Sequence, residues 1–348
     1  MKKTIIFLLL TIVFLIPSCS KNTEKRKYEK ILFDYFDTVT VITGYEDSEE
    51  SFNDVAKEIE AIFDKYHKLY DIYTEYEGIN NFAVINKVSD GKHNKIKVAP
   101  EIIELLEFSL RMHKISKGKV NIAIGSLLSI WHSYREAGIS QPDKAELPLI
   151  DELKEAYLHS DVNDIIIDNE NMTVFINDAK MTLDVGAIAK GYACEQAAIY
   201  LEEKGITGYI INVGGNVRTI GKKPNGDDWV VGIENPNKDD KENPYVASLK
   251  LDNKALVTSG IYQRYYTVNG KNYHHIIDPE TLMPSERYLS VSVLSNDSAL
   301  ADALSTALFN MTYGDGLKLI QGLKDTEALW VLPSGQVVYS EGIKNYLS

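Results

Sequence analysis

The sequence predicts a mixed α/β fold in which mixed sheets pack against helices. Segments with alternating β-branched residues, such as Leu32–Tyr45, are typical of strands, whereas amphipathic segments such as Ser51–Tyr70 are typical of helices. The chain has 348 residues, of which 44% are hydrophobic and 25% charged, a composition typical of globular proteins. No short internal repeat is present, so a repeat array is not expected.

The first half of the chain is predicted to mix strands and helices. The strand at Leu32–Tyr45 precedes the helix at Ser51–Tyr70, which carries its apolar residues on one side. A second helix is expected from about Pro100 to Lys117, because proline suits the first turn and Gly118 suits its end. A Gly-rich turn and an apolar segment with Trp131 follow. A helix around Ile150–His159 and a hairpin at Asp164–Asp178 come next.

Strand patterns dominate the second half. Met181–Val185 is predicted to begin a strand before a helix over about Ile188–Lys204, which Gly205 closes. Two more helices are expected at Leu300–Asn310 and about Gly314–Leu323. The predicted strand segments are Gly208–Lys223, Asp228–Pro236, Val246–Gly260 and Gln263–Pro279, the last with a hairpin turn at Asn269 and Gly270.

The N-terminus resembles a bacterial lipoprotein signal. Lys2 and Lys3 precede an apolar run, Thr4–Ile16, that is too short to span a bilayer comfortably, and Ser18-Cys19 resembles a lipobox. We expect residues 1–18 to be a signal peptide, Cys19 to carry the lipid (diacylglycerol and palmitate), 19–30 to be a membrane tether and 31–348 to be the folded domain. The protein would then be anchored to the cell membrane, facing its extracytoplasmic side. An ordinary signal peptide with an incidental cysteine is the alternative.

Charge and cysteine content narrow the function further. The formal net charge is −13, and removal of Lys2 and Lys3 would leave 35 basic against 50 acidic residues, or −15. Such a surface repels nucleic acid, so no nucleic-acid partner is expected. An anionic ligand would need a helix N-terminus, a few placed cations or a metal. Cys194 is the only cysteine besides Cys19, and we expect it to be a buried small residue.

The stretch LDVGAIAKGYA places Asp184 six residues before Lys190, with glycine and alanine between them. Small residues at a helix start let a ligand approach free N–H groups, and the lysine adds a cation for phosphate. The spacing matches neither a Walker motif nor GxGxxG. A capped helix with small residues for tight packing is the other interpretation.

Asp302 and Thr306 in LADALSTALFN are four residues apart and share one face of the predicted helix. A carboxylate and a hydroxyl oxygen converging on one point would suit Mg²⁺, which takes its other ligands from phosphates and water. The alternative is an acidic residue that complements the helix dipole and a threonine bonded to its own helix.

The remaining polar motifs are weaker. Alternation along a strand puts His274 and His275 on opposite faces, so at most one of them faces a given cleft. The absence of HxH, HExxH and CxxC patterns makes a zinc site unexpected. The loops at Val213–Val217 and Val257–Arg264 could line a pocket or be plain turns.

The order of these motifs resembles the ApbE family of FAD:protein FMN transferases. LDVGAIAKGYA, INVGGN, TSG, HHIIDP and ADALSTAL follow one another from Leu183 to Leu308, and FDTVT, EYEGINNFAVIN and GKVNIAIG fall upstream. The resemblance implies the family's fold, which is T-fold-like, and an Mg²⁺-dependent transfer of FMN from FAD to a Thr or Ser hydroxyl of another protein, with release of AMP. It also implies acceptors among flavin-carrying subunits of Rnf-type or Nqr-type electron-transport complexes.

The resemblance also assigns roles to residues. The family's metal ligands map onto the main-chain carbonyl of Ala187 and the side chains of Asp302 and Thr306, and His275 is our candidate for the base that takes the hydroxyl proton. The flavin contacts map onto Asp184, Lys190, His275, Phe36, Tyr76, Asn81, Lys119, Val120, Asn121 and Thr258.

Two other functions remain open from the sequence. The same site would serve an FAD pyrophosphatase, in which water replaces the acceptor hydroxyl and FMN and AMP are set free. A surface lipoprotein that binds flavin without turnover is the second alternative, although binding alone does not need the metal pair.

Overall fold

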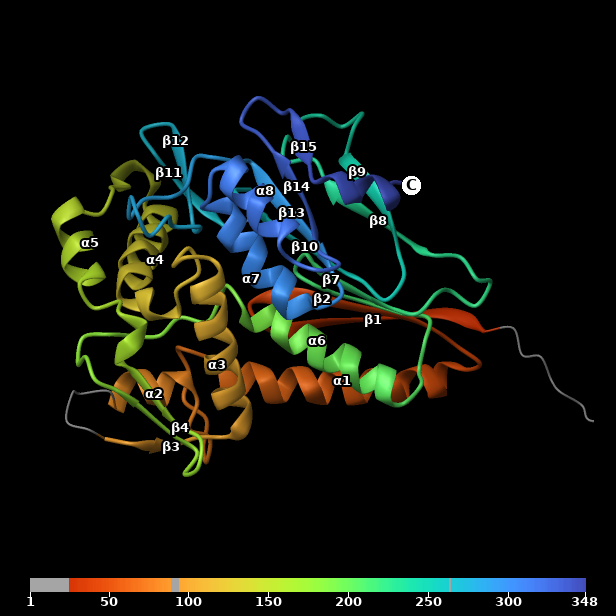
Figure 1. Ribbon diagram of the computed structural model, residues 1–348, viewed down its shortest axis with the longest axis horizontal. Helices are drawn as coiled ribbons and strands as arrows, with labels where there is room; N and C mark the ends of the chain where they lie inside the picture. Colours follow the sequence, from red (N-terminus) through yellow and green to blue (C-terminus); the bar gives the residue numbers. More distant parts are fainter. Residues whose placement is uncertain (1–24, 89–93, 263) are drawn as a thin grey trace, which may run out of the picture.

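A computed structural model describes residues 25–88, 94–262 and 264–348 and confirms the mixed α/β fold. Its main sheet has eight strands in the order β1-β2-β6-β7-β10-β13-β14-β15, and neighbouring strands run antiparallel (Figure 1). The strands are β1 Arg26–Tyr35, β2 Thr38–Glu46, β6 Tyr209–Val213, β7 Asn216–Ile220, β10 Ala255–Gly260, β13 Ser290–Ser295, β14 Glu327–Val331 and β15 Val337–Tyr339.

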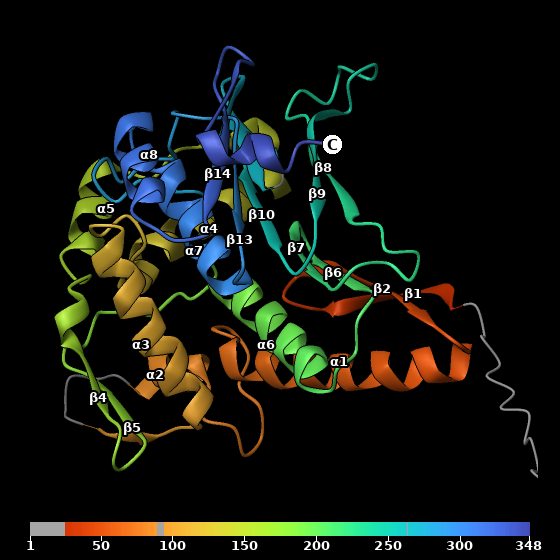
Figure 2. The ribbon, with the colours of Figure 1, turned by 45° about the vertical axis from the view of Figure 1, so that its right-hand side comes forward.

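Three helices pack on one face of this sheet, and α6 (Ala189–Glu203) lies between α1 (Glu49–Tyr70) and α7 (Ser298–Phe309) in Figures 1 and 2. Apolar residues from the sheet and these helices form the main core, among them Ile42, Phe63, Ile211, Leu201 and Leu304. α7 is buried over nearly its whole length, and the Asp297 side chain caps its start by accepting the N–H groups of Ala299 and Leu300. A buried helix of this kind can hold polar side chains in fixed positions.

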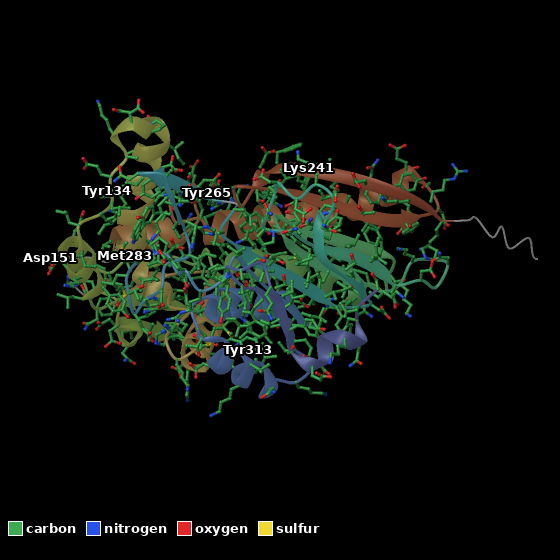
Figure 3. The ribbon with its side chains drawn as sticks, turned by 90° about the horizontal axis from the view of Figure 1, so that it is seen from above. Tyr134, Asp151, Lys241, Tyr265, Met283 and Tyr313 are labelled. Atoms are coloured by element: carbon green, nitrogen blue, oxygen red, sulfur yellow. The ribbon has the colours of Figure 1, made fainter. Side chains whose placement is uncertain are left out.

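Two smaller clusters complete the molecule. α4 (Gly125–Ser140) and α5 (Ile150–Tyr157) pack with the hairpin of β11 (Tyr265–Val268) and β12 (Lys271–His274), and Figure 3 shows Tyr134 and Met283 of this cluster at one end. β8 (Trp229–Glu234) and β9 (Tyr245–Leu251) share a third cluster with leucines of the main sheet. The other elements are α2 Phe82–Val88, α3 Pro100–Ile115, α8 Tyr313–Gln321 and a small sheet of β3 Ile96–Lys97, β5 Thr173–Ile176 and β4 Ile165–Asp168.

Most predicted helices and hairpins are confirmed, with shifted ends. The helices predicted at 51–70, 100–117, 150–159, 188–204, 300–310 and 314–323 are α1, α3, α5, α6, α7 and α8. The hairpin turn at Asn269 and Gly270 has positive φ angles at both residues, 49° and 78°, as a tight two-residue turn requires. Cys194 is buried in α6, as expected.

Two strand predictions were wrong. Leu32–Tyr45 is not one strand, because a turn at Phe36 and Asp37 splits it into β1 and β2, which pair with each other. Met181–Val185 is not a strand. This segment is held instead by the start of α4 and the short helical turn before it, since Gly125 donates to the Thr182 carbonyl and Asp184 donates to the Ile122 carbonyl. Alternation alone cannot distinguish a hairpin or an extended loop from a strand.

The predicted tether is too long at its C-terminal end. β1 begins at Arg26 and pairs with β2, so residues 26–30 belong to the sheet and not to a tether. The predicted signal peptide, Cys19 and the rest of the tether up to residue 24 lie outside the described residues. Among the helices of the described part of the chain, none combines the length and the apolar character needed to cross a membrane.

The contact between α6 and α7 predicts that Gly191→Ala destabilises the protein. A Cβ at Gly191 would lie 2.4 Å from the Asp302 Cβ and 2.4 Å from the Ser298 carbonyl oxygen, so the helices would have to separate. Overpacking of this kind costs about 1–3 kcal/mol, measurable as a lower midpoint in urea. Gly314→Ala is the matched control, because that helical glycine has open space around it. Equal midpoints for both variants would contradict the contact.

Candidate functional site

Asp302 on α7 reaches the first turn of α6. Its Oδ2 accepts a hydrogen bond from the Gly191 N–H at 2.8 Å, and the Lys190 Nζ lies 4.0 Å from the same oxygen. The absence of a side chain at Gly191 permits this approach. The two predicted motifs, which are more than a hundred residues apart in sequence, therefore meet in one place.

The Ala187 carbonyl is left open by the place where α6 begins. Ile188 is the N-cap of α6, so Ala187 precedes the helix and its carbonyl has no intrahelical donor. The Gly191 N–H, which at this position of a helix start lacks an intrahelical acceptor, donates to Asp302, and nothing within the described residues donates to the Ala187 oxygen. Ala187 itself is partly exposed.

Thr306 lies one helical turn beyond Asp302, and its side chain is partly exposed. Its hydroxyl makes no hydrogen bond within the described part of the chain, whereas its neighbour Ser305 donates to the Asp302 carbonyl. A free carbonyl, a carboxylate and a free hydroxyl supply the oxygen ligands that Mg²⁺ prefers. The residues present therefore fit the metal that the resemblance implies.

A metal at this place would depend on a single carboxylate. Among the residues that the structure describes, no three His, Cys, Asp or Glu side chains gather in a way that could hold a metal ion. Neutral oxygens would supply the other protein ligands, an arrangement common for Mg²⁺ when substrate phosphates and water complete the shell.

Burial raises the pKa of Asp302 above the ordinary aspartate value. Desolvation is the main cause, and it is opposed by Lys190, by the Gly191 N–H and by the Asn216 side chain. Only 4% of Asp302 is exposed, and the Asn216 amide nitrogen has no hydrogen bond of good geometry although it faces this carboxyl group. A buried carboxyl group with so little compensation is well suited to receive a cation.

Asp184 organises the loop before α6. Its Oδ1 accepts the Gly186 N–H at 2.8 Å, and the Lys190 Nζ donates to the Gly186 carbonyl at 3.2 Å. The residue keeps some exposed area, but atoms crowd around its carboxyl group, and this desolvation raises its pKa. Lys190, His132 and Arg264 act in the opposite direction. Asp184 and Lys190 thus lie in one electrostatic neighbourhood.

His275 belongs to the same neighbourhood. Its Nδ1 lies 3.2 Å from the Arg264 carbonyl oxygen, which can only accept, so Nδ1 carries the ring proton and Nε2 keeps a free lone pair. Desolvation, with Arg264, His274 and Lys190 nearby, lowers the pKa of His275 to about 3. His274 is buried and its Nε2 contacts the Ser285 carbonyl. The two histidines therefore differ in burial, and Lys190 is among the charges that act on His275.

Several predicted flavin contacts are engaged in holding loops. Asn81 is buried and bonds the Lys68 and Thr74 carbonyls, and the Asn121 side chain caps a short helix by accepting the Ala123 N–H. Lys119 is paired with Asp278 at 2.9 Å and Glu280 at 3.0 Å, next to the buried Val120. These contacts show how the loops are fixed and do not test binding.

The other three predicted flavin contacts are Phe36, Tyr76 and Thr258. Phe36 packs its ring edge-on against His67, and the Tyr76 hydroxyl contacts both His67 and Asp71. Thr258 shares a hydrogen bond with Ser292, and the next residue, Ser259, bonds Ser305 on α7. The β10 end is thereby tied to the helix that carries Asp302.

Sequence reasoning missed a group of cations near Asp184, which includes His132 and Arg264. Arg264 donates from Nη2 to the Asp37 carbonyl at 3.1 Å, and the Arg135 Nη2 contacts the His132 Nδ1 at 2.6 Å. Tyr73, which is 66% exposed, packs on the His132 ring at 5.7 Å. Desolvation raises the pKa of Tyr73, and Asp184, Arg135, Asp37 and Arg264 all affect it. His132 and Arg135 come from α4, Tyr73 from the segment after α1, and Arg264 from the residue before β11, so no short motif reveals the group.

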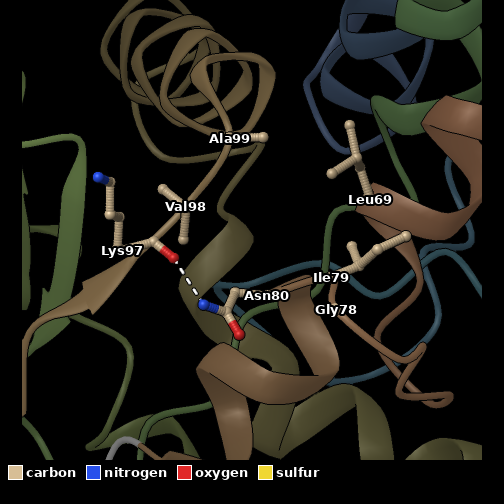
Figure 4. A pocket seen from close by; sticks show the side chains of 7 residues that line it. All are labelled: Leu69, Gly78, Ile79, Asn80, Lys97, Val98 and Ala99. Atoms are coloured by element: carbon tan, nitrogen blue, oxygen red, sulfur yellow. Dashed lines mark hydrogen bonds between the residues drawn. The ribbon is translucent and has the colours of Figure 1, made fainter.

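The cavity in Figure 4 lies elsewhere. About 290 Å³ in volume, it lies at the end of α1 and beside β3, where the Asn80 side chain donates to the Lys97 carbonyl. None of the predicted site residues lines it. The site at α6 and α7 is defined by its polar atoms rather than by this cavity.

Comparisons with known proteins identify the family. A sequence profile of the ApbE family matches residues 36–330, which include Ala187, Asp302, Thr306 and His275. The chain belongs to the ApbE family. The ApbE profile also covers the added cations Arg135 and Arg264.

Individual relatives agree with the ApbE assignment. The FAD:protein FMN transferase of Klebsiella pneumoniae (strain 342) is 29% identical over 280 residues, covering 80% of this chain and 83% of that protein. That of Treponema pallidum (strain Nichols) is 32% identical, covering 70% of each chain. The ApbE protein of Thermotoga maritima has a similar structure, with a TM-score of 0.80, 28% identity, and coverage of 93% of this chain and 100% of that one. The flavin transferase ApbE of Vibrio cholerae shares the fold at a TM-score of 0.75, 22% identity and the same coverage.

The raised pKa of Asp302 predicts that Asp302→Asn stabilises the metal-free protein at neutral pH. The folded state holds the Asp302 proton more tightly than the unfolded chain, so stability falls as the pH rises from the unfolded pKa to the folded pKa. Thermal unfolding without metal should give a higher Tm for Asp302→Asn than for the wild type at pH 7.5, and the gap should close as the pH approaches 4.

Added MgCl₂ should reverse that order. The wild type should gain Tm with MgCl₂ because the cation binds only the folded site, whereas Asp302→Asn should show the small change that NaCl of equal ionic strength produces. A magnesium shift of equal size in both proteins would show that the cation binds elsewhere.

Proposed function

We propose that the protein is an FAD:protein FMN transferase, which moves the FMN part of FAD onto a Thr or Ser hydroxyl of an acceptor protein with Mg²⁺ and releases AMP. One observation carries this proposal: the bond from the Gly191 N–H holds Asp302 at the first turn of α6, just after the free Ala187 carbonyl, and Thr306 lies one helical turn beyond Asp302 on α7. The relatives' activity supports the transfer itself.

The site's positive charges receive the FAD pyrophosphate. The protein is strongly acidic overall, so the ligand's negative charge must be met locally by Lys190, Arg264 and the positive end of the α6 dipole. Ala187, Asp302 and Thr306 would hold Mg²⁺, which when bound neutralises phosphate charge. The chain's own part is to orient the two phosphates, which is most of the catalysis in phosphoryl transfer.

His275 takes the proton of the attacking hydroxyl. The acceptor oxygen forms a bond to the FMN phosphorus, the bond from that phosphorus to the AMP phosphate oxygen breaks, and the hydroxyl proton moves to the free Nε2 of His275. Its pKa of about 3 without ligand keeps the ring neutral, so the lone pair is present across the physiological range. Bound phosphates oppose the desolvation that lowers this pKa, which makes the ring a stronger base when FAD is in place.

Asp184 binds an uncharged part of the flavin nucleotide. A carboxylate would repel the pyrophosphate, and the pKa of Asp184 is raised by desolvation, so hydrogen bonding to a donor such as a ring N–H or a hydroxyl is its favoured role. Gly186 and Lys190 keep the carboxyl group oriented for this contact.

We place the reaction at the outer side of the cell membrane, with Cys19 as the lipid attachment site. The basic start, the apolar run Thr4–Ile16 and the lipobox-like Ser18-Cys19 support this location. The acceptors would then be exported flavin-carrying subunits of the Rnf or Nqr type. Mass spectrometry of Cys19 in the membrane fraction tests the anchor directly.

A transfer assay tests the proposal. The full-length protein, FAD and MgCl₂ should give a fluorescent acceptor band on a denaturing gel, and Asp302→Ala or Thr306→Val should reduce its rate by at least about a hundredfold, the scale for loss of charge stabilisation. Asp315→Ala is the matched control, a carboxylate in the first turn of α8 that should keep full activity.

AMP release distinguishes transfer from hydrolysis. Transfer predicts AMP that appears only with acceptor and in equal amount to bound FMN. AMP and free FMN in equal amounts without acceptor would identify a pyrophosphatase, and tight FAD binding with neither product would identify a flavin-binding protein. No acceptor band in the wild type would contradict the proposal.

A further inference from the structure

The turn between β1 and β2 has an unfavourable backbone. Phe36 and Asp37 both have positive φ angles, 56° and 49°, although neither is glycine. For residues other than glycine, each position in this left-handed conformation is disfavoured roughly tenfold relative to the right-handed one. Contacts from outside the hairpin must therefore hold the turn.

His67 on α1 supplies one such contact. Its Nδ1 accepts the Phe36 N–H at 3.3 Å, and the two rings meet edge to face at 5.6 Å. Because Nδ1 accepts, the ring proton lies on Nε2, which is 3.3 Å from the Tyr76 hydroxyl and donates to it. The Tyr76 hydroxyl then donates to the Asp71 Oδ2 at 3.0 Å.

Asp71 fixes the direction of these bonds. Burial alone would raise its pKa, but the N–H groups of Thr74 and Tyr73 and the Tyr76 hydroxyl hold it below the ordinary value, so the carboxylate is charged and can only accept. His67 is thereby kept in the tautomer that can accept the Phe36 N–H.

Arg264 holds the turn from the other side. Its Nη2 donates to the Asp37 carbonyl at 3.1 Å, while its own carbonyl accepts the His275 Nδ1 at 3.2 Å. After the turn, Val39 accepts the Gly214 N–H at 3.1 Å. The turn is therefore connected to His275 through a single residue.

We propose that His67 is a positioning residue of the flavin site. It holds the Phe36–Asp37 turn against Arg264, and so sets both the wall that Phe36 presents to the flavin and the orientation of His275. The identity of the ligand rests on the proposed function, but the role of His67 in holding the turn rests on the contacts above.

The first test is the affinity of the full-length protein for FAD, measured by flavin fluorescence. His67→Ala removes the acceptor of the Phe36 N–H and should weaken FAD binding about tenfold, the cost of one residue in this backbone conformation. His67→Asn should stay within about threefold of the wild type, because its Oδ1 takes the place of Nδ1. His159→Ala is the control: this histidine also bonds a partner, Asp178, but lies away from the turn and should not change the affinity.

A second substitution tests the mechanism. Asp37→Gly should restore the affinity of His67→Ala to within about threefold, because glycine adopts positive φ without outside support. A purely structural role of His67 in packing α1 would not be rescued at Asp37. Wild-type affinity in His67→Ala, or no rescue by Asp37→Gly, would overturn the proposal.

Two further outcomes are decisive. If His67→Ala does not fold, the comparison is between His67→Asn and His67→Gln. The Asn amide replaces Nδ1, which holds the turn, whereas the Gln amide replaces Nε2, so His67→Asn must bind FAD more tightly. Equal affinities of these two variants would overturn the proposal. Because binding is measured without an acceptor, a wild type that binds FAD but transfers nothing would contradict the proposed function and leave the test of His67 intact.

Discussion

The hydrogen bond from the Gly191 N–H to the Asp302 carboxylate is the interaction on which the site depends. It joins α6 to α7 and holds the buried Asp302 carboxylate at the first turn of α6, just after Ala187, whose carbonyl precedes the helix and accepts no hydrogen bond within the described residues. Glycine at 191 is the condition for it, because any Cβ would collide with α7. Burial of the Asp302 carboxylate lowers the stability of the folded protein at neutral pH, and the same burial favours binding of a cation beside it.

A buried ion network keeps the two helices at the distance that this bond needs. Glu195 on α6 accepts the Ser298 N–H at the start of α7 at 2.6 Å and also pairs with Arg218 of β7 at 3.1 Å. The Arg218 Nη2 also pairs with Glu202, which lies seven residues after Glu195 on α6, at 2.9 Å. Breaking such a buried pair by removing one partner is costly, so the helix spacing is rigid. Rigid spacing is what an oxygen site for a small cation requires, since Mg²⁺ tolerates little change in its ligand distances.

The sequence allowed the prediction of α6 and α7, and it singled out Asp184, Lys190, Asp302 and Thr306 as candidates, because each motif is local and their order is specific. The β1–β2 turn could not be predicted, since Phe36 and Asp37 carry none of the glycine or asparagine signals that mark tight turns. Arg264, the α4 residues Arg135 and His132, and His67 of α1 come from three separate parts of the chain and meet only in the folded protein. Their roles depend on tertiary contacts, for which a single sequence contains no pattern.

A crystal structure of the protein with Mn²⁺ in place of Mg²⁺ would test the central claim most directly, because manganese takes the same oxygen ligands and is located by its anomalous scattering. The account predicts one anomalous peak at about 2.0–2.2 Å from the Ala187 carbonyl oxygen, an Asp302 carboxylate oxygen and the Thr306 hydroxyl, with the Gly191–Asp302 bond retained. A peak at other residues, or an Ala187 carbonyl that accepts the Gly191 N–H in a regular helix, would contradict it.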